Sequence, residues 1–304
     1  MVTRAPSSDC DPPPGPWSIG SLLDWATAKL AAEEITDARR DARLLLAAAL
    51  ALPLSRLIGF PEQAVTRDAA GRFAALVAGR CRHAPVSRLL GAREFWSLPF
   101  GLNAHTLDPR PDTETLVAAV LARIPDPQAP LRLLDLGTGS GCILLALLSE
   151  LPQAHGVGVD ISTPAIAQAR QNASDLGLAS RAAFYVSNWA DALRSDLDNG
   201  LRFDWVLSNP PYIESADLAG LAPEVTGYDP PCALDGGADG FAAYRAIAPL
   251  LRRMLTAQGQ VALEHGAGQS PGLCRLLAAQ GLQILARPVD LSGQPRCVVA
   301  RPCG

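Results

Sequence analysis

Apolar residues recur at helical spacing between residues 18 and 85. Spacing of i, i+3, i+4 and i+7 places them on one face of each helix, and such faces pack against one another in bundles. Asp37 and Thr66 stand where N-caps are expected. The three stripes consist of Ile19, Leu22, Leu23, Ala26 and Leu30, then Ala42, Leu45, Leu46, Ala49 and Leu50, then Phe73, Leu76 and Val77. The pattern predicts a small helical domain with these residues in its core.

From residue 131 onward, short apolar runs alternate with helical stripes. The runs predict strands near 131–136, 155–160, 181–187, 203–207, 259–265, 282–289 and 296–301. Helices are predicted near 114–123, 141–150, 163–177, 240–257 and 269–280. Such alternation is typical of a mostly parallel sheet with helices on both faces. The predicted fold class is therefore α/β, with a Rossmann-like sheet of seven strands.

The polar and Pro-rich stretches divide the chain into four parts. Residues 1–17 are predicted to be a disordered tail, because they are polar and rich in proline. Residues 18–85 are predicted to form the helical domain. Residues 86–107 carry short aromatic runs interrupted by Pro99 and Gly101, which predicts a hairpin linker. The α/β domain is expected to span residues 108–304.

Composition limits the cell compartment and the binding partners that are expected for this chain. The formal net charge is −4 and Lys29 is the only lysine, so an extended nucleic-acid groove is not expected. The 7 cysteines are scattered and never spaced as Cys-x-x-Cys, which favours neither disulfides nor a metal site. No apolar run reaches membrane-spanning length, and the N-terminus lacks the apolar core of a signal peptide. We expect a cytoplasmic protein without a metal or a membrane partner.

Asn209, Pro210, Pro211 and Tyr212 follow the apolar run 203–207, so they are expected where a buried strand ends at a crevice. Proline lacks a backbone N–H and stiffens the segment. The Asn209 side chain and the Pro210 carbonyl offer two acceptors, and Tyr212 offers an aromatic face. Two acceptors side by side suit an NH2 group on a planar substrate. The alternative is a rigid turn with no ligand role.

A glycine-rich turn, Gly137-Thr138-Gly139-Ser140-Gly141, directly follows the first strand of the α/β domain. Glycines allow a ligand to approach the backbone closely. The spacing differs from the Gly-x-Gly-x-x-Gly fingerprint of dinucleotide sites. It suits the amino-acid part of S-adenosylmethionine (SAM), with Asp135 available for the ammonium group.

The next two strands also end in polar residues. Asp160 is expected to accept hydrogen bonds from two ribose hydroxyls, each worth about 1.5–3 kcal/mol. Its alternative role, capping the following helix, suits Ser162 or Thr163 better. Asn188 is placed to meet an adenine edge. Two roles are open for Trp189: packing against the adenine ring, or packing in the hydrophobic core.

The glycine turn, Asp160, Asn188 and the segment 209–212 follow successive predicted strands in this order. With this order of motifs, the chain resembles a class I SAM-dependent methyltransferase. The Asn-Pro-Pro-Tyr signature is shared by adenine-N6 methyltransferases of nucleic acids and glutamine methyltransferases of proteins. The wider match resembles the peptide chain release factor N5-glutamine methyltransferase (HemK) family. It rests on the helical bundle and on Arg110-Pro111-Asp112-Thr113-Glu114, Tyr228-Asp229-Pro230, Ala233-Leu234, Gly236-Gly237, Asp239-Gly240, Tyr244-Arg245 and Glu264-His265-Gly266.

The resemblance implies methyl transfer from SAM, leaving S-adenosylhomocysteine, to the Gly-Gly-Gln glutamine of class I release factors by a monomeric enzyme. It implies that the helical domain holds the substrate protein. The implied catalytic and substrate residues are Asn209, Pro210, Pro211 and Tyr212, and the implied cofactor residues are Asp135, Gly137, Thr138, Gly139, Gly141, Asp160, Asn188, Trp189 and Asn209. The family often has Asp where Asn188 stands. A sister family methylates a ribosomal-protein glutamine but usually differs at residues 110–114.

Residues 213–241 carry six acidic residues and no lysine or arginine. An acidic border to the substrate site disfavours a phosphate backbone and attracts a basic protein loop, although a solvated acidic loop is the ordinary alternative. A nucleic-acid adenine methyltransferase would need a basic groove, for which the candidates are Arg80, Arg82, Arg88 and Arg93. A non-catalytic SAM-binding module is the second competitor.

Overall fold

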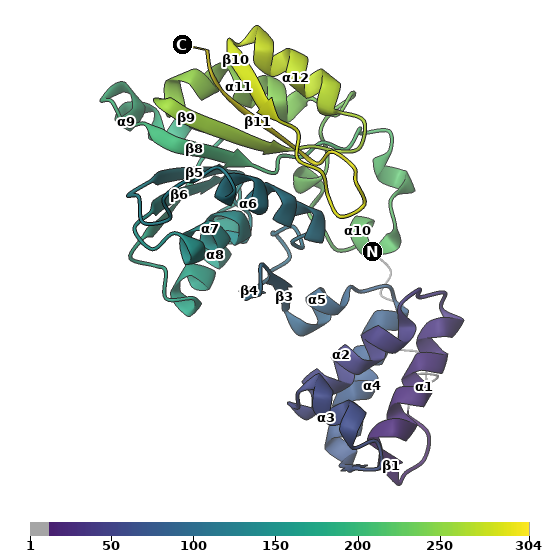
Figure 1. Cartoon of the computed structure of the whole chain (residues 1–304). Coiled ribbons are helices and arrows are strands. Elements are labelled where there is room, and N and C mark those ends of the chain that lie inside the picture. Colours follow the sequence, from purple (N-terminus) through teal and green to yellow (C-terminus); the bar gives the residue numbers. More distant parts are fainter. Residues whose placement is uncertain (1–11, 304) are drawn as a thin grey trace. The chain divides into compact units, whose positions relative to one another are not determined.

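The computed structural model describes residues 12–303, which divide into two compact units (Figure 1). Unit 1 contains the chain up to Gly91 together with Pro223–Tyr228, and unit 2 contains Ala92–Ala222 and the chain from Asp229. Residues 1–11 of the predicted tail lie outside the described residues. No helix within residues 12–303 has both the length and the apolarity to span a membrane.

Unit 1 is built from the predicted helical stripes. Ser18 starts the first helix with a capping box, in which its side chain and that of Ser21 each accept the other's backbone N–H. Ile19, Leu45 and Phe73, one from each stripe, are fully buried together. The elements are β1 (Trp17–Ser18), α1 (Ile19–Ala32), α2 (Ala38–Leu50), α3 (Leu54–Gly59), β2 (Ala64–Val65), α4 (Arg67–Cys81), α5 (Val86–Leu90) and α10 (Pro223–Thr226). The hairpin linker was predicted to begin at residue 86, but Val86–Leu90 form the helix α5.

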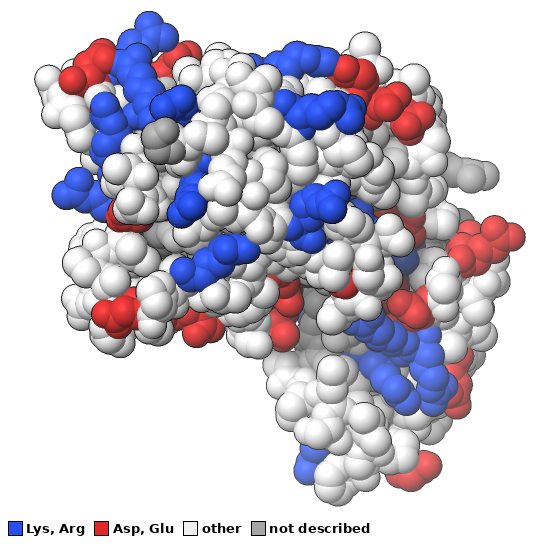
Figure 2. Space-filling view, turned by 45° about the horizontal axis from the view of Figure 1, so that its top comes forward, with Lys and Arg blue, Asp and Glu red and all other residues white. Residues whose placement is uncertain are grey.

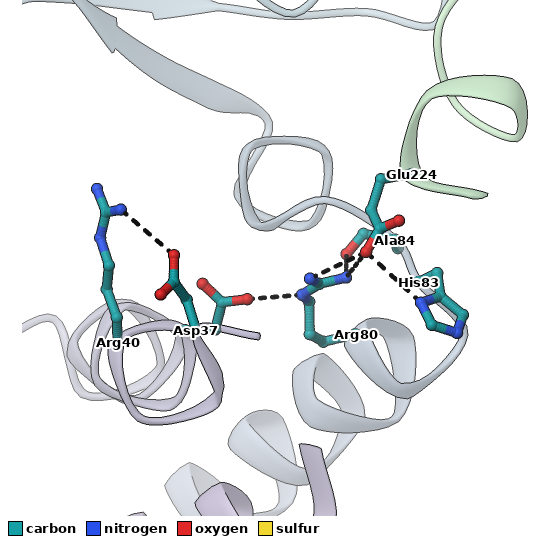
Figure 3. Close-up of polar contacts among 7 residues, drawn as sticks. Asp37, Arg40, Arg80, His83, Ala84 and Glu224 are labelled. Atoms are coloured by element: carbon teal, nitrogen blue, oxygen red, sulfur yellow. Dashed lines mark hydrogen bonds and ion pairs between the residues drawn. The ribbon is translucent and has the colours of Figure 1, made fainter. Parts of the chain in front are cut away.

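A buried arginine joins α10 to the other helices of unit 1 (Figure 3). Arg80 is 8 % exposed; its Nε donates to Asp41 at 2.7 Å and its terminal nitrogens donate to Glu224 at 3.2 Å. Burial raises the pKa of Glu224, but hydrogen bonds from its own backbone N–H and from Arg80 outweigh burial and lower that pKa. The Tyr228 hydroxyl donates to the Arg82 carbonyl at 3.2 Å. Segment 223–228 is therefore held in unit 1 by charge pairing and hydrogen bonds.

Unit 2 contains the predicted sheet, and the fold class is confirmed. Its strand order is β10-β11-β9-β8-β5-β6-β7, in which β11 is antiparallel to both of its neighbours. The strands are β5 (Arg132–Leu136), β6 (His155–Asp160), β7 (Ala182–Val186), β8 (Phe203–Ser208), β9 (Leu255–Glu264), β10 (Leu282–Ala286) and β11 (Cys297–Pro302). A separate hairpin, β3 (Ala92–Phe95) and β4 (Leu98–Gly101), precedes the sheet.

Helices cover both faces of the sheet (Figure 1). One face packs on α6 (Glu114–Leu121), α7 (Cys142–Glu150) and α8 (Thr163–Asp175), and the other on α11 (Ala242–Met254) and α12 (Ser270–Ala279). Short helical segments occupy the loops: η2 (Pro111–Thr113), η3 (Asp191–Leu193), α9 (Arg194–Asp198), η4 (Leu218–Gly220) and η5 (Pro231–Ala233).

The parallel strands β7, β6, β5, β8 and β9 end at a common edge of the sheet. Ser208, the last residue of β8, pairs with Leu263 of β9. Asn209 therefore leaves the sheet beside Glu264, although 54 residues of sequence lie between them. This edge is where open parallel sheets bind ligands.

Candidate active site

A cavity of about 280 Å³ opens in unit 2 at this edge. Its walls come from the loops that follow β5, β6, β7 and β8 and from the segment before α6. Among the residues predicted for the site, the cavity is lined by Gly137, Thr138, Gly139, Asp160, Asn188, Trp189, Asn209 and Pro211. The other predicted residues, Asp135, Gly141, Pro210 and Tyr212, do not line it.

The turn after β5 adopts a conformation that requires glycine. Gly137, Gly139 and Gly141 have φ values of 72°, 55° and 81°, in the left-handed region where a side chain is strained. The N–H groups of Gly137 and Thr138 both donate to the Val159 carbonyl, which ties the turn to β6. The backbone can therefore border the cavity without side chains that would fill it.

Asp160 ends β6 with both carboxylate oxygens oriented by the backbone. One accepts the Gly139 N–H at 2.9 Å and the other the Ser162 N–H at 2.8 Å. Burial raises the pKa of Asp160, and these hydrogen bonds oppose it. Ser162 caps α8 by accepting from Ala165, so Asp160 does not cap that helix. Each oxygen retains a lone pair for a ligand hydroxyl, which fits a ribose.

Asp135 lies behind the glycine turn and is fully buried. The Thr138 hydroxyl donates to one carboxylate oxygen at 2.7 Å, and no described residue donates to Oδ1. Burial raises the pKa of Asp135 to about 7. A buried oxygen without a donor fits a site that an ammonium group completes. The contact between Asp135 and such a group stays a prediction.

Trp189 lies between the cavity and the hydrophobic core, and its contact with a ligand stays a prediction. Its indole lines the cavity and also packs against the core beneath α11. A Cβ at Gly137 would lie 3.9 Å from the indole Cζ3, so the ring borders the glycine turn. The neighbouring Asn188 is exposed at the cavity wall.

The Asn209 side chain is oriented by Thr113. Its Nδ2 donates to Thr113 Oγ1 at 3.1 Å, which leaves the carbonyl oxygen of the amide for another partner. Pro210 is buried, and Pro211 lines the cavity. The arrangement gives the end of β8 an oriented acceptor beside the cavity.

Tyr212 is held by residues that approach it closely. Its backbone carbonyl accepts from Gln269 Nε2 at 2.9 Å. A Cβ at Gly266 would lie 3.0 Å from the Tyr212 ring, and one at Gly236 would lie 2.7 Å from its Cα. Glycine at both positions therefore makes room for the tyrosine, and burial raises the pKa of its hydroxyl.

Thr113 and Glu264 are the polar residues that sequence reasoning missed. Their exposed fractions are 2 % and 1 %, and both lie next to the turn at residues 209–212. Thr113 was noted only within the motif Arg110-Pro111-Asp112-Thr113-Glu114, and no site role was predicted for it. An acid near the end of the predicted strand 259–265 was the available signal for Glu264, but the sequence does not show that this strand lies beside β8.

Three of the six acidic residues in segment 213–241 form ion pairs. Glu224 pairs with Arg80, Asp229 with Arg110, and Asp239 with Arg245. Asp235 accepts from Ser215 and from the Gly237 N–H. Within the described residues, the structure shows no ion pair for the remaining two acids, Glu214 and Asp217, and both are exposed.

Comparison with known proteins identifies the family. Residues 21–91 match the PrmC N-terminal domain model, and residues 127–295 match a methyltransferase domain model. A release factor glutamine methyltransferase of Rhodospirillum rubrum is 46 % identical over 93 % of this chain and 85 % of its own. One of Bradyrhizobium diazoefficiens is 45 % identical over 93 % and 95 %. This chain belongs to the release factor glutamine methyltransferase family.

The family resemblance seen in the sequence is thereby confirmed. The chain is a methyltransferase, and SAM is its methyl donor. Among solved structures, the catalytic domain of hMettl16 in complex with an RNA hairpin aligns with a TM-score of 0.53 at 15 % identity, covering 75 % of this chain and 82 % of that one. That likeness shows the shared fold of the methyltransferase domain and no more.

Proposed function

We propose that this release factor glutamine methyltransferase transfers the methyl group of SAM to the side-chain N5 of the glutamine in the Gly-Gly-Gln loop of class I release factors. The observation that carries the proposal is the oriented Asn209 amide at the end of β8, beside a cavity that Asp160 and the glycine turn shape for a nucleoside. We further propose that the enzyme works as a cytoplasmic monomer.

In this proposal the protein positions the reacting amide. The Asn209 side-chain carbonyl and the Pro210 backbone carbonyl accept the two N–H groups of the glutamine, and Tyr212 packs beside it. Two such bonds favour a pyramidal nitrogen, whose lone pair is free to attack. SAM supplies an activated methyl group on its sulfonium, so in-line positioning and exclusion of water are the main demands. The attacked nitrogen loses its proton readily, since alkylation makes it acidic.

Charge distribution supports a protein substrate over a nucleic acid. Arg80 is buried between Asp41 and Glu224, and Arg93 lies 3.9 Å from Asp108, so these arginines are engaged by acids. On the face shown in Figure 2, basic side chains form separate groups with acidic and uncharged surface between them. A nucleic-acid groove needs a continuous basic strip. We propose no direct nucleic-acid contact.

The test is to incubate the purified full-length chain with SAM and a class I release factor and to locate the added methyl by mass spectrometry. One methyl on the Gly-Gly-Gln glutamine is expected, and none on DNA, RNA or a ribosomal-protein glutamine. Methyl transfer to those competitors alone, or SAM binding without any methylated product, refutes the proposal.

Asn209→Ala is expected to lower the rate by about 10²–10³-fold, by analogy with deleting one preorganised polar group. Single-turnover methyl transfer at saturating SAM measures the effect. Asn199→Ala, which changes an exposed residue of the same type at the end of α9 and outside the cavity lining, is the matched control and is expected to retain the transfer rate. Turnover of Asn209→Ala near the unmodified rate contradicts the role assigned to Asn209.

A further inference from the structure

The Asn209 amide must face one way for the proposed reaction. A side-chain amide has a carbonyl oxygen that accepts and an NH2 group that donates, and rotation by half a turn exchanges them. Only the carbonyl oxygen is able to accept an N–H from a substrate amide. A reversed Asn209 would present an NH2 group to another NH2 group, so the orientation of this side chain decides whether the site works.

Thr113 interacts with the NH2 group of Asn209 and so bears on which of the two amide orientations is adopted. Its Oγ1 accepts from Asn209 Nδ2 at 3.1 Å and is buried at the start of α6. A hydroxyl is also a donor, so Thr113 alone would tolerate a reversed amide by donating to the Asn209 oxygen. Something must therefore hold the Thr113 proton away from Asn209.

Glu264 is placed to hold that proton. The register of β8 with β9 puts it beside Asn209, and it is 1 % exposed. Its Oε2 is buried and has no hydrogen-bond donor among the described residues, so it is free to accept a hydroxyl proton. Burial raises the pKa of this carboxyl, and the Thr113 and Tyr212 hydroxyls oppose that effect. An ionised carboxylate only accepts, so it draws both hydroxyl protons towards itself. The Thr113 lone pair is then directed at Asn209 Nδ2.

From this network we infer that Thr113 and Glu264 are positioning residues that keep the Asn209 carbonyl oxygen directed at the substrate amide. The inference deepens the proposed function and rests on it for the identity of that amide. Neither residue touches the reacting atoms in this account. Thr113 acts through Asn209, and Glu264 acts through Thr113.

The charge of Glu264 gives the network a pH dependence. Burial raises the pKa of Glu264 to about 7. The Thr113 hydroxyl lowers this pKa, and the charge of Asp112 raises it. Arg296 and the Tyr212 hydroxyl lower it as well. The remaining titratable groups that interact with Glu264 are Tyr244, Cys142 and Cys297. A protonated Glu264 would donate to Thr113 and release the Thr113 proton towards Asn209. Methyl transfer is therefore expected to fall as the pH drops through about 7.

Three variants of the full chain test the inference. Thr113→Val removes the hydroxyl at nearly constant shape, Thr113→Ser keeps it, and Glu264→Gln replaces the acceptor with a group that also donates. Thr113→Val and Glu264→Gln are expected to lower kcat by about 10–100-fold, by analogy with the loss when residues that orient metal ligands are replaced. Thr113→Ser is expected to retain kcat. SAM affinity by calorimetry and the unfolding temperature are expected to stay unchanged and verify folding.

Two readouts separate positioning from general stability. The fall in kcat below a pH of about 7 should disappear in Glu264→Gln, which carries no titrating carboxyl. In an Asn209→Ala background, Thr113→Val should have no further effect, because residues that act through one another are not additive. A full kcat in Thr113→Val, an unchanged pH profile in Glu264→Gln, or additive losses would overturn the inference.

An NMR measurement keeps the inference separate from the proposed function. The side-chain NH2 signal of Asn209, assigned by its absence in Asn209→Ala, is measured without any substrate. In the unmodified protein and in Thr113→Ser it should exchange with solvent at least tenfold more slowly than in Thr113→Val. Equal exchange in all three refutes the positioning role, whereas normal protection with no methylated release factor refutes only the proposed function.

Discussion

The cofactor half and the amide half of the site are built in different ways. The cofactor half consists of short continuous stretches, in which the glycine turn and the end of β6 supply backbone N–H groups to Asp160. The amide half consists of side chains from three distant segments, and Asn209 and its partner Thr113 are 96 residues apart. Backbone groups therefore shape the cofactor half, whereas a network of side chains shapes the amide half.

Each half contains one buried carboxyl with a threonine beside it. Asp135 is bonded to Thr138, and Glu264 interacts with Thr113. Burial raises the pKa of each to about 7. Asp135 lies beneath a turn that a cofactor would cover, whereas Glu264 is connected to Asn209 through Thr113. In the mechanism proposed above, the same pair of groups serves cofactor binding in one half and orientation of a side chain in the other.

Substitution of Asp160 should have the largest effect in this comparison. Asp160→Ala removes the acceptor for two ribose hydroxyls, so SAM affinity is expected to fall by about 100-fold, while kcat at saturating SAM changes little. Calorimetry gives the affinity, and single-turnover transfer gives the rate. Thr113→Val, with the opposite pattern of unchanged affinity and lowered kcat, is the matched control. If Asp160→Ala lowers kcat as strongly as affinity, the two halves are not separable.

The cofactor half was the more predictable from sequence, and the reason is physical. Asp160 is the last residue of a predicted strand, and Gly137 and Gly139 follow another, so a correct strand assignment already places them at the sheet edge. Glu264 could not be placed in this way, because its proximity to Asn209 depends on β9 lying beside β8. The strand and helix pattern of unit 2 was predicted for the same reason, since periodicity is local.

Segment 213–241 shows the same limit. Its acidic composition was visible in the sequence, but the pairing of Glu224 with Arg80 joins residues 144 positions apart. No local pattern predicts a contact of that separation. The packing of α10 with the helices of unit 1, and the loss of free negative charge that accompanies it, therefore emerged only from the structure.

Glu224→Gln tests whether the segment beyond Tyr212 stabilises unit 1 without affecting the cofactor half of the site. The substitution leaves Arg80 with Asp41 as its one charged partner, so unit 1 is expected to lose about 1 kcal/mol of stability. Thermal unfolding of the full chain measures the loss, and Asp24→Asn, which removes an exposed ion pair, is expected to cost less. SAM affinity should not change. A lowered SAM affinity would show that the segment also influences the cofactor half.

Reversal of the two unpaired acids should have the smallest effect and should act only on substrate binding. Glu214→Lys with Asp217→Lys is expected to weaken release-factor binding by about three- to tenfold at low salt, because long-range attraction to a basic loop is lost, and the effect should vanish at about 0.5 M salt. Asp175→Lys with Asp196→Lys, both exposed elsewhere in unit 2, makes the same charge change and serves as control. Equal binding by both double variants at low salt would mean that net charge alone matters. A weakening confined to the first would place the substrate protein beside the amide half.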